Sequence, residues 1–105
     1  MEQKLEELII EEVVDSTKKY GEFNSTHEGY AVLLEELDEL SVEYNSMIYW
    51  KERLWESIKT NDPEHVVEAI INLKILSIRL LQEGIQVAAM SNKFFQLMNH
   101  KVKND

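Results

Sequence analysis

Three closely spaced glutamates are the residues of this sequence best placed to do chemistry. Glu35, Glu36 and Glu39 form the pattern E-E-x-x-E within residues 26–39, THEGYAVLLEELDE. In a helix, Glu36 lies about 100° and Glu39 about 40° around the axis from Glu35. The three carboxylates therefore project from the same side, where they could share one hard cation such as Mg²⁺.

A solvated acidic face explains the same pattern without a ligand. The opposite side of this helix carries an apolar row, formed by Tyr30, Leu33, Leu37, Leu40, Tyr44 and Ile48. Such a helix is amphipathic, and acids on its outer face need only water. The spacing alone therefore leaves a metal site and a solvated face both open.

Size and composition narrow the class of protein. The chain has 105 residues, enough for one domain with one core, but self-association would help to bury its apolar surface. Only three Gly and one Pro are available for turns, which favours helices. Cysteine is absent, so a disulfide framework, a thiolate metal site and a cysteine nucleophile are excluded.

The charge balance bears on partners and location. Twenty acidic and 11 basic residues give a formal charge of −9, which disfavours nucleic acid because phosphate neutralisation needs clustered Lys and Arg. A divalent cation would still screen nucleotide phosphates from the carboxylates. Polar residues interrupt the apolar stretches and the first residues do not resemble a signal peptide, so we expect no membrane partner and a cytosolic protein.

Apolar periodicity predicts helices joined by short connectors. Residues 3–19 carry a helical stripe, and a connector with Ser25 or Thr26 as the helix cap precedes a second helix whose end stays open. Asp62 can cap a further helix, because Pro63 fits its first position.

Residues 63–98 contain no strong helix breaker except Gly84, so they form one very long helix or two, followed by a polar tail at about 99–105. Apolar residues between Val66 and Leu81 surround the axis of this segment, more than one packed face requires. We predict a single all-α helical bundle over residues 1–105 that forms a homo-oligomer, either a dimer or a tetramer.

The stretch around the three glutamates resembles the metal motif of the MazG-like all-α nucleoside triphosphate pyrophosphohydrolases. The family pattern T-H-x-x-(L/Y)-x-x-x-L-E-E-x-x-E is matched by Thr26, His27, Tyr30, Leu34, Glu35, Glu36 and Glu39. The resemblance is strong over residues 23–40 and weaker over 80–95. It implies a phage or bacterial protein that uses Mg²⁺, or alternatively Mn²⁺, to convert an NTP or dNTP into a nucleoside monophosphate and pyrophosphate.

MazG-like enzymes complete their cation site with E-x-x-D on a later helix, which corresponds here to Glu83-Gly84-Ile85-Gln86. By this resemblance Glu35, Glu36, Glu39 and Glu83 are the metal ligands and the catalytic carboxylates. Gln86 is neutral where the family has aspartate. Its amide carbonyl can ligate a hard cation, or its side chain can serve as a structural hydrogen-bond partner. About forty residues separate the two acidic segments, which implies an extra helix or an extended hairpin.

Three further residues are candidate substrate contacts. His27 could contact the substrate, with a capping or surface role as the alternative. Lys93, two turns beyond Gln86, could contact a phosphate, with a solvated end as the alternative. Trp50 could stack on the base, but aromatic residues at helical spacing, such as Trp50 and Trp55, more often fill a core or an interface.

Three functions therefore stay open. The leading one is a Mg²⁺-dependent nucleoside triphosphate pyrophosphohydrolase in the cytosol of a bacterium or of a phage-infected host. Gln86 motivates the second, a nucleotide-binding protein without turnover that sequesters a nucleotide or a nucleotide-derived signal, as a phage decoy would. The third is a structural helical adaptor whose apolar helices bind a partner and whose acids only face water.

Overall fold

Three helices make up the fold. The computed structural model describes residues 1–104 and contains α1 (Glu2–Tyr20), α2 (Thr26–Lys59) and α3 (Pro63–Asn104) in that order. Residues 1–104 contain no strand, which confirms the all-α class. None of the helices in this part of the chain is both long and apolar enough to span a bilayer.

The helix boundaries follow from local chemistry. The Ser25 side chain accepts a hydrogen bond of 3.1 Å from the Glu28 backbone N–H, and so caps α2. At the start of α3, Asp62 Oδ1 accepts a hydrogen bond of 3.3 Å from the His65 backbone N–H, and Pro63 takes the first helical position. Both caps match the sequence prediction.

The two points left open by the sequence are resolved in favour of long helices. α2 runs through to Lys59 without a break, and residues 63–98 form one helix. α3 continues through residues 99–104, which the sequence assigned to a polar tail, while Asp105 lies outside the described residues. Lys101 and Lys103 lie in the last turn, where a positive charge interacts favourably with the helix dipole.

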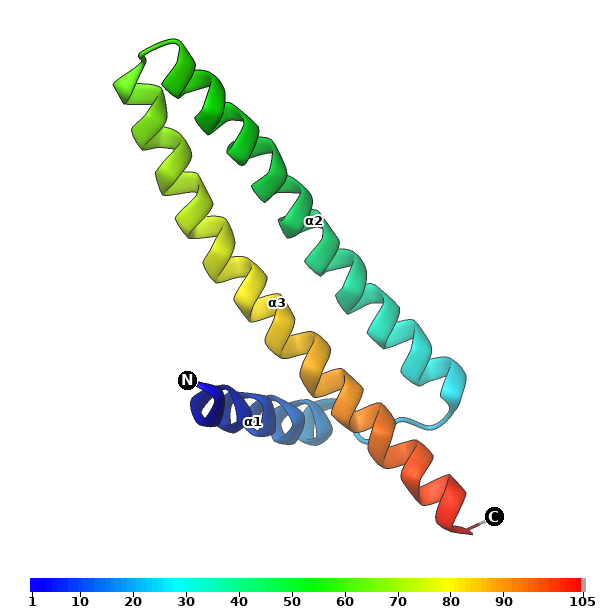
Figure 1. Ribbon diagram of the computed structural model, residues 1–105. Coiled ribbons are helices and arrows are strands. Elements are labelled where there is room, and N and C mark those ends of the chain that lie inside the picture. Colours follow the sequence, from blue (N-terminus) through cyan, green and yellow to red (C-terminus); the bar gives the residue numbers. More distant parts are fainter. Residues whose placement is uncertain (105) are drawn as a thin grey trace.

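The second and third helices form an extended antiparallel hairpin (Figure 1). On α3, one row of residues at alternating spacings of three and four is buried or half-buried. This row, the α3 seam, consists of Val66, Ala69, Leu73, Leu76, Leu80, Glu83, Val87, Met90, Phe94 and Leu97. The spacing is that of a coiled-coil contact, and it holds α3 against α2 over nearly its whole length.

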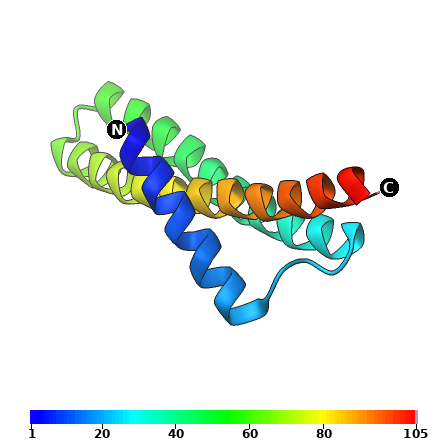
Figure 2. The same ribbon diagram turned by 90° about the horizontal axis from the view of Figure 1, so that it is seen from below.

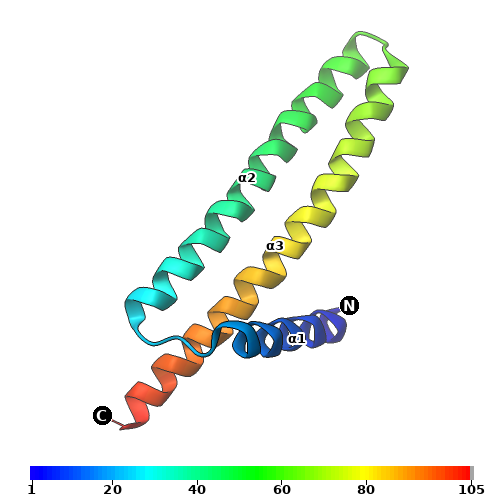
Figure 3. The ribbon, with the colours of Figure 1, turned by 180° about the vertical axis from the view of Figure 1, so that it is seen from behind.

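The first helix packs across α3 near the open end of the hairpin and projects to one side of it (Figures 2 and 3). The small core lies there, built on the buried residues Phe23, Ala89 and Met90. Partly buried apolar residues from all three helices pack around them, namely Ile9, Val13, Val32, Leu33, Phe94 and Leu97.

Gly29 permits the closest approach of α2 and α3 in this region. It is buried, and a Cβ atom at this position would lie 2.9 Å from Cδ2 and 3.0 Å from Cγ of the Phe94 ring. Any other side chain therefore forces the ring out of its place in the core.

We predict that Gly29→Ala destabilises the protein although alanine favours helix. Overpacking costs about 1 to 3 kcal/mol and the gain in helix propensity is about 1 kcal/mol, so we expect a net loss of about 1 kcal/mol in the free energy of unfolding. The measurement is urea denaturation of Gly29→Ala, Phe94→Leu and the double variant. The double variant should lose less free energy of unfolding than the two single variants together. Strictly additive losses would show that the Phe94 ring is not what disfavours a side chain at position 29.

Candidate metal centre between the long helices

The α3 seam is interrupted by a carboxylate. Glu83 occupies a seam position between Leu80 and Val87, where an apolar side chain would pack against α2. Across the hairpin, Glu36 of α2 is also half-buried. A solvated acidic face does not describe these two residues, because Oε2 of Glu36 and Oε2 of Glu83 are both buried.

A third carboxylate completes the cluster. Glu36, Glu39 and Glu83 each offer a carboxylate oxygen, and these oxygens all lie within 4.8 Å of one another. Two ligands on opposite sides of a Mg²⁺ ion are about 4.2 Å apart, and two ligands of Ca²⁺ about 5 Å. Modest side-chain movements would thus let the three residues, which we call the glutamate triad, hold one divalent cation.

No positively charged side chain among residues 1–104 forms an ion pair with the triad. With all three groups ionised, Glu36 Oε2 and Glu83 Oε2 find no hydrogen-bond donor among the described residues. A buried carboxylate oxygen without a donor is costly, and repulsion between neighbouring carboxylates adds to that cost. The cluster therefore needs a proton or a cation.

The pKa values show how strongly the triad binds a proton. Burial raises the pKa of Glu36 from 4.5 to about 7, with smaller contributions from the charges of Glu39, Glu83 and Glu35. Burial is also the main cause that raises the pKa of Glu83, followed by the charge of Glu39. Interaction with the Glu83 side chain contributes a further, smaller increase to the pKa of Glu36.

A cavity of about 780 Å³ lies beside the triad, between α1 and the hairpin. Glu35, Glu36, Gln86 and Lys93 line it, so the structure brings these four predicted site residues together. Glu39 and Glu83 adjoin the cavity through the triad, since both lie next to Glu36.

Lys93 is buried, with only 4% of its surface exposed, so the alternative of a solvated end is wrong. Its ammonium group donates to Ser16 Oγ at 2.9 Å and to the carbonyl oxygen of Gly21 at 3.0 Å. The same group lies 4.6 Å from the centre of the Phe23 ring. Lys93 therefore fixes the end of α1 to α3 and places a positive charge at the cavity wall.

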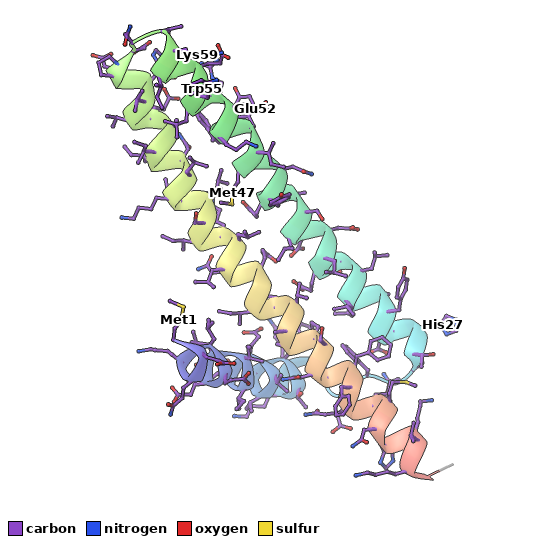
Figure 4. All side chains as sticks on the ribbon, in the orientation of Figure 1. Met1, His27, Met47, Glu52, Trp55 and Lys59 are labelled. Carbon is purple, nitrogen blue, oxygen red and sulfur yellow. The ribbon has the colours of Figure 1, made fainter. Side chains whose placement is uncertain are left out.

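Two predicted substrate contacts lie outside the cavity of this chain. His27 is exposed and points away from the hairpin at the beginning of α2 (Figure 4). Trp50 lies 14 residues beyond Glu36, about 21 Å along α2, and packs edge-on against Tyr49 with 5.3 Å between ring centres. Core packing does not describe Trp55, whose side chain is exposed.

The structure also adds residues that the sequence reasoning missed. The α1 residues Glu12, Asp15 and Lys19 line the cavity, and the charge of Glu43 helps to raise the pKa of Glu83. The position of Glu43, seven residues after Glu36, is a detectable signal because a heptad returns to the same helix face. Nothing in α1 alone indicates that it covers the site.

No known protein family, curated protein or solved structure matches the chain. An all-oxygen cluster without cysteine or histidine is typical of sites for hard cations such as Mg²⁺, Mn²⁺ and Ca²⁺.

We predict that stability falls as pH rises from about 4.5 to 7 in the presence of a chelator. In this window folded Glu36, with its pKa of about 7, binds protons that the unfolded chain has released. After allowance for solvent screening, the proton on Glu36 should account for a fall on the order of 1 kcal/mol in the free energy of unfolding across this window, and Glu36→Gln should abolish that fall. The measurement is urea denaturation at several pH values, with Asp38→Asn on the exposed side of α2 as the control. If the free energy of unfolding changes equally with pH in the wild type and in Glu36→Gln, the raised pKa of Glu36 in the triad is contradicted.

We predict that Lys93→Met loosens α1 selectively. Methionine keeps the apolar part of the side chain but removes the donors to Ser16 and Gly21, so we expect a loss of about 1 to 3 kcal/mol. Amide hydrogen exchange should become faster in α1 while the hairpin turn keeps its protection. Lys101→Met, at the exposed end of α3, is the control, and unchanged exchange in α1 would rule out the pinning role.

Proposed function

We propose that the protein is a Mg²⁺-dependent nucleoside triphosphate pyrophosphohydrolase. The observation that carries the proposal is the glutamate triad, in which one buried carboxylate oxygen each of Glu36 and Glu83 has no hydrogen-bond donor, beside a cavity of about 780 Å³. A structural seam has no use for such a cluster, whereas a cation makes it favourable. The MazG-like motif supports the same function, and Mn²⁺ is the alternative metal.

The residues take distinct roles in this proposal. Glu36, Glu39 and Glu83 hold the metal from the two long helices, and Glu35 extends the ligand set into the cavity. Bound Mg²⁺ supplies charge for the phosphates and acidifies a water molecule. Because Glu35 is exposed at the cavity, it can orient the attacking water and accept its proton. The water oxygen bonds to the α-phosphorus as the bond from that phosphorus to the α–β bridging oxygen breaks, so that the bridging oxygen leaves with pyrophosphate and the nucleoside monophosphate remains.

The cavity has room for a nucleotide, and part of its lining is apolar and suits the base. Phe23, Val32 and Met90 line it together with the polar residues, so an apolar surface is available to a base. Lys93 supplies positive charge at the wall, although two of its three N–H donors are already used. The acidic walls mean that the triphosphate enters with its divalent cations. We propose a cytosolic location and a homo-oligomeric assembly.

A nucleotide-binding protein without turnover is the second candidate, and Gln86 favours it. Gln86 lines the same cavity as Glu36, and it is neutral where MazG-like enzymes have aspartate. A missing negative ligand weakens the hold on the metal and the activation of water more than it weakens nucleotide binding. Such a protein would sequester a nucleotide or a nucleotide-derived signal.

We predict that the wild type binds Mg²⁺ or Mn²⁺ and releases pyrophosphate from at least one common NTP or dNTP. Gln86→Asp should raise metal affinity and turnover about tenfold each, because a negative ligand is restored beside Glu83, and a tenfold change corresponds to about 1.4 kcal/mol. Glu83→Gln should lose metal binding. The measurements are calorimetry with each metal and pyrophosphate release across the nucleotides, with Asp38→Asn as the matched control.

The outcomes separate the candidates. Tight nucleotide binding without pyrophosphate release in the wild type would contradict the enzyme and favour the binding protein. Metal binding that Glu83→Gln leaves unchanged would contradict the triad as the site. Absence of both nucleotide binding and turnover would leave a structural adaptor.

A further inference from the structure

The last turns of α1 form a wall of the cavity that lies outside the glutamate motif. Ser16, Lys19 and Tyr20 line the cavity from α1, whereas Glu35 and Glu36 line it from α2. In Figure 2 the C-terminal end of α1 stands away from the hairpin, and the connector at residues 21–25 leads back from it to α2. A ligand that is bound at the triad through a metal ion therefore has α1 as a further surface to contact.

Tyr20 is an aromatic side chain of this wall that the core does not use. Of the described residues that line the cavity, Tyr20 and Phe23 are aromatic. Phe23 is only 7% exposed and belongs to the core, whereas Tyr20 is 72% exposed. A single exposed aromatic residue is ordinary on a protein surface, but Tyr20 stands at the edge of a cavity that Val32 and Met90 also line.

One face of the Tyr20 ring is already occupied within the chain. The Lys19 ammonium group lies over this ring, 5.3 Å from its centre. Because Tyr20 is largely exposed, its other face is open to a planar ligand group. Every nucleobase has such a planar face, and stacking on an aromatic side chain is a general way of binding a base.

The backbone on both sides of Tyr20 is fixed. Gly21 ends α1 with a φ of 77°, which favours glycine, and its N–H donates to the carbonyl oxygen of Thr17 at 2.8 Å. Lys93 donates to Ser16 Oγ and to the Gly21 carbonyl oxygen, before and after Tyr20 in the chain. An exposed side chain on an anchored turn loses less freedom when it binds a ligand. Lys93 is thus a positioning residue for Tyr20.

We infer that Tyr20 stacks on the base of the bound nucleotide, with Lys19 behind its ring and the triphosphate held at the triad through the metal. The inference rests on the proposed function and adds a contact that the MazG-like motif of this chain does not contain. Tyr20 takes the role considered for Trp50, which lies about 21 Å along α2 from Glu36. Because Tyr20 contacts the base and the triad binds the phosphates, the two contacts can be tested separately.

The test compares ligands with and without a base. The ligands are α,β-imido analogues of the common nucleoside triphosphates, which resist cleavage between the α- and β-phosphates, and inorganic tripolyphosphate, each with Mg²⁺. In calorimetry Tyr20→Ala should weaken binding of the nucleotide analogues about tenfold, because the stacking surface is lost. It should leave binding of tripolyphosphate unchanged. Tyr20→Phe keeps the ring and should bind the analogues as the wild type does.

Tyr49→Ala is the matched control. Tyr49 is also exposed, at 55%, but it lies about 20 Å along α2 from Glu36. The control should leave the binding of both kinds of ligand unchanged. In turnover, Tyr20→Ala should raise KM more than it lowers kcat, because stacking holds the base equally in the ground state and in the transition state.

A fluorescent reporter repeats the test without the alanine variant. In a chain with Trp50→Phe and Trp55→Phe, the further change Tyr20→Trp leaves a single tryptophan, in the last turn of α1. The nucleotide analogues should quench its emission by stacking on it, and tripolyphosphate should not.

The outcomes distinguish this inference from the proposed function. Nucleotide binding that Tyr20→Ala leaves unchanged would overturn the inference while the proposed function stands. Equal weakening of nucleotide and tripolyphosphate binding would do the same, because it would show a structural role for Tyr20. A wild type that binds none of the nucleotide analogues would contradict the proposed function and the inference with it.

Discussion

The cost of placing carboxylates inside an apolar helix contact governs this structure. Glu83 takes a seam position that packing would assign to a residue such as leucine, and Glu36 and Glu39 bring two further negative groups to it. Without a compensating charge, the contact between α2 and α3 is weakest at this point. A proton on Glu36, whose pKa is raised, relieves part of the cost, and a divalent cation would relieve more because its charge offsets all three carboxylates together.

The rest of the fold holds the two sides of this cluster in register. The long helices give the seam its length, so apolar contacts on both sides of Glu83 keep the carboxylates close. Close packing of Gly29 against Phe94 and the anchor from Lys93 to α1 fix the end of the hairpin next to the cavity. The acidic cavity therefore lies on the side of the hairpin that α1 covers, and uncovered apolar surface lies on the other side.

Local patterns predicted much of this arrangement. The caps at Ser25 and Asp62 and the three helices follow from residue type and periodicity. The spacing of Glu36 and Glu39 predicted that they share one side of their helix, and their carboxylate oxygens do lie close together. The link to Glu83 came from the family motif, since spacing along one helix cannot identify a partner on another. The extended hairpin that accounts for the forty residues between the acidic segments was one of the two predicted arrangements.

Contacts distant in sequence were beyond such patterns. Lys93 bonds to Ser16 across 77 residues, so its burial depends on how α1 docks and not on its neighbours in the chain. For the same reason α1 was not expected to line the cavity, and Trp50 was considered as a substrate contact although α2 carries it away from the triad. Trp55 is exposed in the single chain, so its surroundings likewise depend on whatever packs against the uncovered apolar side of the hairpin.

The most direct test of the central claim is the anomalous scattering of Mn²⁺ in crystals of the wild-type protein. The account predicts one strong peak between α2 and α3, within about 2.3 Å of a carboxylate oxygen from each of Glu36, Glu39 and Glu83. Mn²⁺ bound elsewhere, while the triad stays metal-free with Glu36 protonated, would contradict this metal site. The three glutamates would then only bind a proton and weaken the contact between α2 and α3.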